Sequence, residues 1–366
     1  MTIEGSAAAQ DALERIAGDL GGTLGVAARN LATGASLSVN ADETFPLAGL
    51  VALPVVVTVM RQVDDGRLRL DERLPLRESD KSPGGALVHC RAGLMPALRD
   101  LVCLALAAGD ETATDMLWRQ AGLESVNQSM RELSFESIDC GVPNRARYLV
   151  RSGLGSEAKE PGGVEAAARW RQLEARDGRE AALARLLDDH AGVTGAALLR
   201  HRERLRTMTD PGAAAAFEQV DNRASPHDVT ELLTMMAEAR CASAPSCRLM
   251  VEAMSRQQWR AKIAAGLPSG TRVANLGGSD AGVSNDAAIV CGSDHIPLVL
   301  VAAWKGLAAG RAPAAPGAIA TIAGVLCDRL AGPAQMDRAA SGDVCRVLAG
   351  EAAASDGAAD GARGTS

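Results

Sequence analysis

The stretch Phe45-Pro-Leu-Ala-Gly-Leu-Val-Ala-Leu-Pro-Val-Val-Val-Thr-Val-Met60 is apolar from Leu47 onward except for Thr58. A run that is apolar on every side, and too short to cross a bilayer, is typical of a helix buried in a protein core. Pro54 removes one backbone donor, so we expect either a kink or a helix that begins late in the stretch. The stretch therefore predicts a central buried helix around which the chain packs.

Strand-like segments lie on both sides of a helical middle. Residues 23–31 and 35–40 precede the buried helix and are joined by a hairpin-turn signal, whereas 271–275, 285–291 and 296–304 come near the end of the chain. Helix-like segments include 6–20, 95–107, 110–118, 125–133, 229–239, 246–256 and 316–330. Strands divided between the two chain ends predict an α+β fold, with one antiparallel five-stranded sheet built from both ends beside a helical lobe.

The chain of 366 residues is long enough for one large domain. We expect a single domain over residues 1–348 and a disordered tail over 349–366, where Ala, Gly, Asp and Ser predominate. Residues from about 151 to 219 are rich in Arg, Glu and Ala and poor in large apolar side chains. This composition predicts a solvated helical insertion or lid.

Charge and composition exclude several classes of partner. The formal net charge of -7 argues against nucleic acid, and no stretch is as long and apolar as a transmembrane helix. The N-terminus lacks the basic start and apolar core of a signal peptide, so the sequence predicts a cytoplasmic protein. The five histidines show no metal-ligand spacing, and we expect neither a metal nor another cofactor. The eight cysteines lie scattered through apolar segments, which favours reduced, mostly buried thiols.

Several stretches resemble class A serine β-lactamases and penicillin-binding proteins. The buried helix is similar to the nucleophile helix of that family, written approximately F-P-x-A-S-x-x-K-x-P. Further similar stretches are Gly66-Arg-Leu-Arg-Leu-Asp-Glu72, Pro83-Gly-Gly85, Asp110-Glu-Thr-Ala-Thr-Asp115, Asn222-Arg-Ala-Ser-Pro-His-Asp228, Leu267-Pro-Ser-Gly-Thr-Arg-Val-Ala-Asn-Leu-Gly-Gly-Ser279 and Gly282-Val-Ser-Asn-Asp286. The resemblance covers roughly residues 10–150 and 217–331 and implies the β-lactamase/transpeptidase fold.

The same resemblance implies that the catalytic residues of the family are missing. That chemistry uses a serine nucleophile, a lysine one helical turn later and a second serine that passes the proton on. Gly49 stands at the serine position and Ala52 at the lysine position. The S-D-N motif lies over Gly109, Asp110 and Glu111, and the K-T-G motif over Leu276, Gly277 and Gly278. Among these positions the family residue is kept at Asp110 and Gly278, both mainly structural.

These exchanges predict a roomier and less positive cleft. Its candidate ligand-binding residues are Glu111, Ser279 and Asp110, and Glu111 would favour neutral or cationic ligands over anions. Each has a structural alternative, because Glu111 suits a helix N-terminus satisfied by backbone amides and a strand-edge serine is usually solvated. Replacement nucleophiles to consider are Ser79 and Ser82 near Lys81, and the thiols Cys90 and Cys140. The glutamate that completes the family's reaction cannot be placed among Glu136, Glu157 and Glu160.

Two functional hypotheses follow. The chain is either a non-hydrolytic pseudoenzyme that binds a small molecule or a protein in the old cleft, or a retooled enzyme, for instance of a biosynthetic pathway, with a different residue set. The genes beside this one would discriminate between the two. Residual β-lactamase activity requires a nucleophile that the sequence does not reveal.

Overall fold

The computed structural model describes residues 3–153, 164–207, 218, 221–292, 297–330 and 342–349. Five antiparallel strands form its main sheet, in the spatial order β2-β1-β7-β6-β5. They are β1 (Thr23–Asn30), β2 (Ser36–Val39), β5 (Arg272–Asp280), β6 (Val283–Cys291) and β7 (Pro297–Lys305). Because β1 pairs directly with β7, the two ends of the chain share one sheet. The predicted α+β fold with a five-stranded antiparallel sheet is confirmed.

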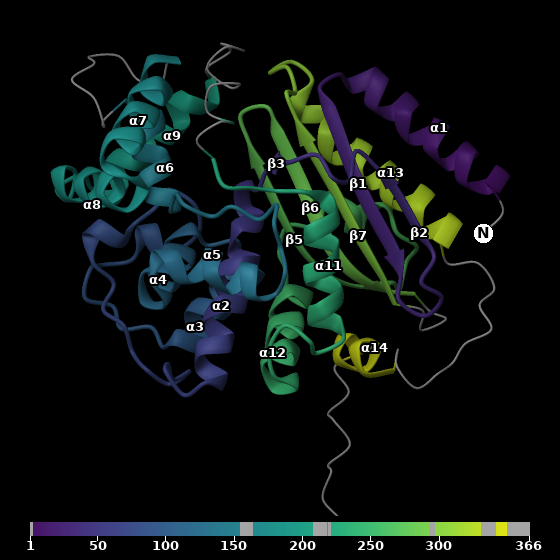
Figure 1. The fold of residues 1–366 in the computed structure, drawn as a ribbon, viewed down its shortest axis with the longest axis horizontal. Helices are drawn as coiled ribbons and strands as arrows, with labels where there is room; N and C mark the ends of the chain where they lie inside the picture. Colours follow the sequence, from purple (N-terminus) through teal and green to yellow (C-terminus); the bar gives the residue numbers. More distant parts are fainter. Residues whose placement is uncertain are drawn as a thin grey trace, which may run out of the picture.

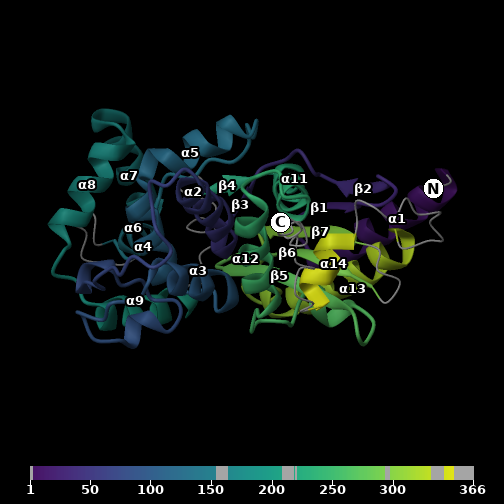
Figure 2. The same cartoon turned by 90° about the horizontal axis from the view of Figure 1, so that it is seen from below.

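Helices cover both faces of the sheet (Figure 1, Figure 2). On one face, α1 (Ile3–Leu20) and α13 (Ala315–Leu330) enclose a core around the fully buried Trp304. The other face packs against the helical lobe through a larger apolar core. The helices of that lobe are α2 (Ala52–Asp64), α3 (Leu98–Ala107), α4 (Glu111–Ala121), α5 (Leu123–Glu132), α11 (Pro226–Ala237) and α12 (Ala244–Ser255).

The stretch that begins at Phe45 is divided into three elements. Phe45–Pro46 forms β3, which pairs with β4 (Arg223–Ala224), and a short 3-10 helix follows over Ala48–Val51. The α-helix proper, α2, begins at Ala52, so Pro54 lies in its first turn, where its missing N–H breaks no helical bond. The prediction of a buried helix that begins late is therefore confirmed.

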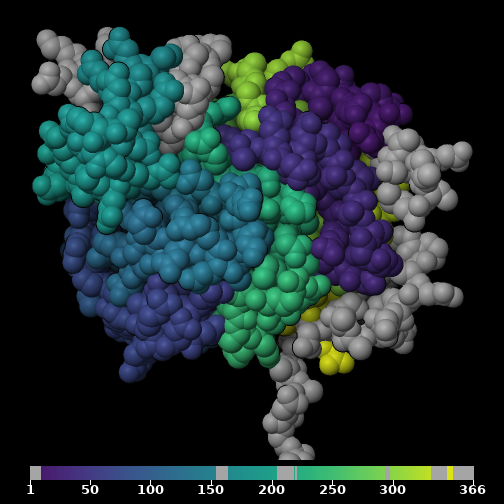
Figure 3. All heavy atoms as spheres, viewed as in Figure 1, coloured from purple at the N-terminus to yellow at the C-terminus, as the bar shows by residue number. Residues whose placement is uncertain are grey.

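A second group of helices lies between α5 and α11 in sequence and stands at one corner of the molecule (Figure 3). It consists of α6 (Asn144–Arg151), α7 (Val164–Asp177), α8 (Arg179–Asp189) and α9 (Gly195–Thr207). These helices share a small apolar core of their own, with Leu149, Trp170 and Leu183 at its centre. Glu157, Glu160 and the tail 350–366 lie outside the described residues.

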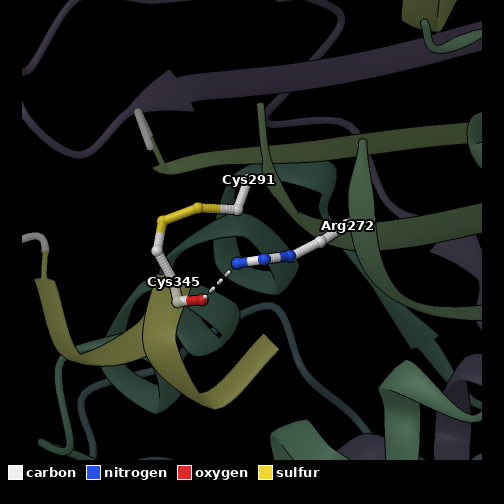
Figure 4. Close-up of a disulfide and its surroundings, with 3 residues drawn as sticks. All are labelled: Arg272, Cys291 and Cys345. Atoms are coloured by element: carbon white, nitrogen blue, oxygen red, sulfur yellow. Dashed lines mark hydrogen bonds between the residues drawn. A yellow bond between two sulfur atoms is a disulfide. The ribbon is translucent and has the colours of Figure 1, made fainter. Parts of the chain in front are cut away.

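One disulfide corrects the prediction that all cysteines are reduced. Cys291 at the end of β6 is bonded to Cys345 in α14 (Gly342–Ala349), and Arg272 donates a hydrogen bond to the Cys345 carbonyl (Figure 4). The two cysteines are 54 positions apart, and sequence spacing alone does not reveal which of the eight cysteines will pair. Across the described ranges, no helix is long and apolar enough to cross a membrane.

Candidate functional site

The place where the family carries its nucleophile is closed by backbone. A Cβ at Gly49 would lie 2.6 Å from the carbonyl oxygen of Gly277 and 3.1 Å from Cα of Gly278. A Cβ at Gly278 would in turn overlap the backbone nitrogen of Gly49. The prediction of a roomier cleft is wrong at this point, because β5 and the 3-10 helix approach each other until their backbones are in contact. Ala52 and Leu276 are buried in the adjoining apolar core.

Asp110 is occupied by backbone amides. It caps the N-terminus of α4, and its carboxylate accepts hydrogen bonds from Ala113 N (2.9 Å), Ala86 N (2.6 Å) and Leu87 N (2.8 Å). Burial raises the pKa of this carboxyl, and the backbone hydrogen bonds oppose that rise. Its geometry is that of a structural anchor for the loop before Cys90, which leaves no free oxygen for a ligand.

Glu111, the first residue of α4, faces α6 instead of the amides of its own helix. Its Oε1 accepts a hydrogen bond from the Tyr148 hydroxyl at 3.3 Å and lies 3.7 Å from Nη2 of Arg147. Its Oε2 is buried and has no hydrogen-bond partner in the described part of the chain. Gly84 packs so closely that a Cβ there would lie 2.5 Å from the Glu111 carboxyl carbon. Burial raises the pKa of Glu111, while Arg147 and Arg202 act in the opposite direction.

Two arginines of α6 lie between the lobe and β5, where they meet three carboxylates. Arg147 lies 3.5 Å from Asp221 and 3.4 Å from Asp280, and Arg151 pairs with the same two carboxylates. Burial raises the pKa of Asp280, but Arg151 and Arg147 outweigh it and lower that pKa to about 2. Burial disfavours the charge on Arg147, yet Asp221 and Asp280 outweigh it and raise the pKa of the guanidinium. The expectation of a less positive cleft therefore omitted these arginines.

This set of Glu111, Arg147, Arg151, Asp221 and Asp280 is called the charge cluster below. All but Glu111 and Asp280 are at most 6% exposed in their side chains. The sequence offered one signal for it: Arg147 and Arg151 are four positions apart and so lie on one face of a helix. Nothing in the sequence placed that helix against the end of β5.

Ser279 does not join Glu111, because side chains alternate between the two faces of a strand. Leu276 points toward the lobe, whereas Val273 packs in the core beneath α13, and Ser279 shares the orientation of Val273. The three predicted ligand-binding residues thus lie apart. Glu111 and Ser279 are on opposite sides of β5, and Asp110 is the buried N-terminal cap of α4.

Ser279 instead meets a lysine that sequence reasoning missed. Nζ of Lys262 donates hydrogen bonds to Gly278 O (2.7 Å), Asn285 O (2.8 Å) and Ser279 Oγ (2.9 Å). Burial lowers the pKa of Lys262 to about 8, and the charge of Asp286 opposes that shift. Lys262 precedes a short 3-10 helix at Ile263–Gly266, outside every motif that the sequence analysis used.

Two of the replacement nucleophiles considered, Ser82 and Cys140, are not assembled for catalysis. Ser82 is buried and donates a hydrogen bond to Asp115 Oδ2 at 2.7 Å, and Lys81 pairs with Glu78 at 2.7 Å. Burial raises the pKa of the Cys140 thiol, which opposes formation of a nucleophilic thiolate. In the described ranges, no group of three or more His, Cys, Asp or Glu side chains is arranged to hold a metal ion.

Residues 8–330 match the model of the beta-lactamase enzyme family. The chain belongs to this family. Among solved structures, the β-lactamase of Sphaerobacter thermophilus shares 24% identity, with a TM-score of 0.63 over 89% of this chain and 97% of that one. PBP-A shares 20% identity, with a TM-score of 0.65 over the same shares of the two chains. At these identities the likeness shows the fold alone.

Curated relatives match shorter segments. A β-lactamase of Rhodobacter capsulatus is 31% identical over 127 residues, which are 34% of this chain and 43% of the relative. The β-lactamase regulatory protein BlaB of Streptomyces cacaoi is 29% identical over 113 residues, 30% of this chain and 36% of that protein. The matched segments thus span less than half of each relative.

Proposed function

We propose that this chain is a non-hydrolytic member of the beta-lactamase family that acts by binding a small molecule. The observation that carries the proposal is the contact between Gly49 and the Gly277 carbonyl. Gly49 offers no oxygen for attack on a lactam, and the space that a serine Cβ would need is filled by backbone. Covalent catalysis requires an activated nucleophile beside a base, and this position supplies neither.

Two further points support the proposal. The charge cluster and Tyr148 occupy the region between the lobe and β5 with the chain's own side chains, each held by partners from other elements. In addition, one of the curated relatives is named a regulatory protein, so membership of the family does not by itself imply hydrolysis.

Intact-mass spectrometry tests the proposal. After incubation with penicillin G or a chromogenic cephalosporin, we expect no mass increase and no absorbance change above the buffer rate. A stoichiometric adduct would overturn the proposal. The triple variant Gly49→Ser, Ala52→Lys, Leu276→Lys is a stricter test. We expect no burst of acylation from it, because the new Cβ at position 49 meets the Gly277 carbonyl.

A second candidate function is a retooled enzyme, and the Ser279–Lys262 contact favours it. A lysine with a pKa near 8 is neutral often enough at alkaline pH to accept the proton of a serine hydroxyl that attacks an acyl group. Two of the three donors of Lys262 are bound to backbone carbonyls, however, which also suits a structural role and ranks this candidate second.

A fluorophosphonate probe separates the two candidates. Labelling that rises between pH 7 and pH 9 and is lost in Ser279→Ala would support the enzyme. Lack of labelling in the native protein at pH 9 would reject it.

A further inference from the structure

A pocket in the α6–α8 group provides a binding site away from the closed cleft. Its volume is about 350 Å³, which falls within the range of roughly 300–1,000 Å³ typical of small-molecule sites. Apolar side chains from three helices line it: Val150 of α6, Trp170 and Leu173 of α7, and Leu186 of α8. An elongated apolar group is the occupant that such walls favour.

The polar groups of the pocket come from one face of α7. Arg169, Leu173 and Arg176 lie four and three positions apart, so they follow one another along that face. The two arginines are separated by about 10 Å along the helix axis, with the apolar side chains between them. The lining therefore combines two positive groups with apolar side chains.

The two arginines differ in how well they are already paired. Arg176 makes two hydrogen bonds of 2.6 Å to Asp177. The ion pair of Arg169 is with Glu165 at 3.9 Å, and the side chain of Glu165 is 83% exposed. Arg169 is thus the more available cation for an anionic ligand.

Trp170 forms an aromatic wall of the pocket. Its side chain lines the pocket and the residue is 4% exposed, yet its indole Nε1 has no hydrogen-bond partner in the described residues. Arg169 and Trp170 line the same pocket, so a ligand whose carboxylate binds Arg169 can contact the Trp170 side chain.

We propose that this pocket binds an apolar molecule with a single carboxylate, of about the size of a medium-chain fatty acid, that Arg169 holds the carboxylate and that the Trp170 side chain contacts the apolar part. This inference rests on the proposed binding function and gives it a site and a ligand class. Val150 also belongs to α6, the helix that carries Arg147 and Arg151, so the occupant contacts the element that fills the old cleft.

The test uses octanoate, octanol and octylammonium as matched probes of one chain length. The chain has four tryptophans, and the indole N–H signal of Trp170 is identified in a proton–nitrogen correlation spectrum by its loss in Trp170→Phe. We expect octanoate to shift the Trp170 signal in a saturable manner, and octylammonium to leave it unchanged. The signals of Trp304, whose Nε1 is bonded to Gly21 O, and of Trp259, which is 72% exposed, should stay in place.

Arginine variants locate the carboxylate. We expect Arg169→Gln to weaken octanoate binding by about tenfold and Arg176→Gln to weaken it less, because Asp177 already pairs with Arg176. Arg185→Gln, on α8 and outside the lining, should have no effect. Equal affinity for octanol and octanoate, no shift of Trp170 up to millimolar octanoate, or a shift of Trp259 alone would each overturn the inference. None of these results touches the proposed lack of hydrolysis, which the mass measurement on the same sample decides.

Discussion

The carbonyl oxygen of Gly277 lies 2.6 Å from the position that a Cβ at Gly49 would take. Gly49 must therefore stay small, since a side chain on it would collide with the backbone of a residue more than two hundred positions away. Gly278 adds the reciprocal constraint from the strand side. The missing serine and the closed cleft have the same structural cause, because β5 occupies the space that a serine side chain at position 49 would need.

Replacing Gly49 by Ala tests this contact. The added methyl group fits only if the backbone moves, and overpacking of this kind costs about 1–3 kcal/mol. The variant should therefore unfold at a lower denaturant concentration. Gly18→Ala is the matched control, since nothing lies within 4 Å of its new Cβ on the exposed side of α1. The control should be neutral or slightly stabilising. A Gly49→Ala variant as stable as the native protein would mean that β5 can retreat and that the cleft is not closed.

Glu111→Gln tests the buried carboxylate. Burial raises the pKa of Glu111, so the folded state prefers the protonated form. The contribution of this group to stability is complete below the ordinary glutamate pKa and is lost as the pH rises through the raised value. Gln resembles the protonated form, so the stability of the variant relative to the native protein should increase by about 1 kcal/mol between pH 4 and pH 8.

Denaturant unfolding at the two pH values provides the measurement. Glu165→Gln, at a side chain that is 83% exposed, serves as control and should give a much smaller pH-dependent difference. A Glu111→Gln difference that stays flat between pH 4 and pH 8 would show that Arg147 and Arg202 fully compensate the carboxylate.

The sequence predicted the fold well because its signals are local or repeated. Apolar strands at both chain ends and a buried helix after Phe45 are patterns that a core imposes on the sequence. The closed cleft could not be predicted, since glycines at positions 49 and 277 are equally compatible with empty space and with close backbone contact. Only the positions of β5 and the 3-10 helix decide between these readings.

The same limit explains the groups that were missed. Arg151 stands at the start of the segment whose composition suggested a solvated lid, and Arg147 lies just before it. Both arginines are buried against Asp221 and Asp280, which are distant in sequence. Lys262 stands between recognisable elements, and no local pattern indicates that a loop lysine will be buried against a strand. Charge pairs of this kind form because the tertiary fold brings distant residues together, and a single sequence does not show which residues will meet.

The electrostatic interaction between Lys262 and the buried Asp286 offers a third prediction. Burial raises the pKa of Asp286 to about 6, although Lys262 acts to lower it. Removal of one partner leaves the other charge buried, so Lys262→Met should cost about 3 kcal/mol at pH 8. At pH 5 the cost should be smaller, because Asp286 can then take up a proton. Asp286→Asn in the Lys262→Met background should restore part of the loss, and strictly additive single effects would show that the two residues do not interact.

The disulfide between Cys291 and Cys345 gives the last prediction. It fastens α14 to the end of β6 and closes a loop across 54 positions. In the chain-entropy model a loop of this length stabilises the fold by about 4 kcal/mol, so Cys345→Ser should lower the unfolding free energy by about 2–4 kcal/mol. The native protein in a strong reductant should lose a similar amount, and the variant should not respond to the reductant. Cys327→Ser, which replaces a half-buried thiol, controls for the substitution itself.

Structural disulfides persist mainly in oxidising compartments, so this bond counts against the cytoplasmic location that the N-terminus suggested. If the native protein proves insensitive to reductant and thiol counting finds eight free cysteines, the bond is not formed in solution and that argument falls with it.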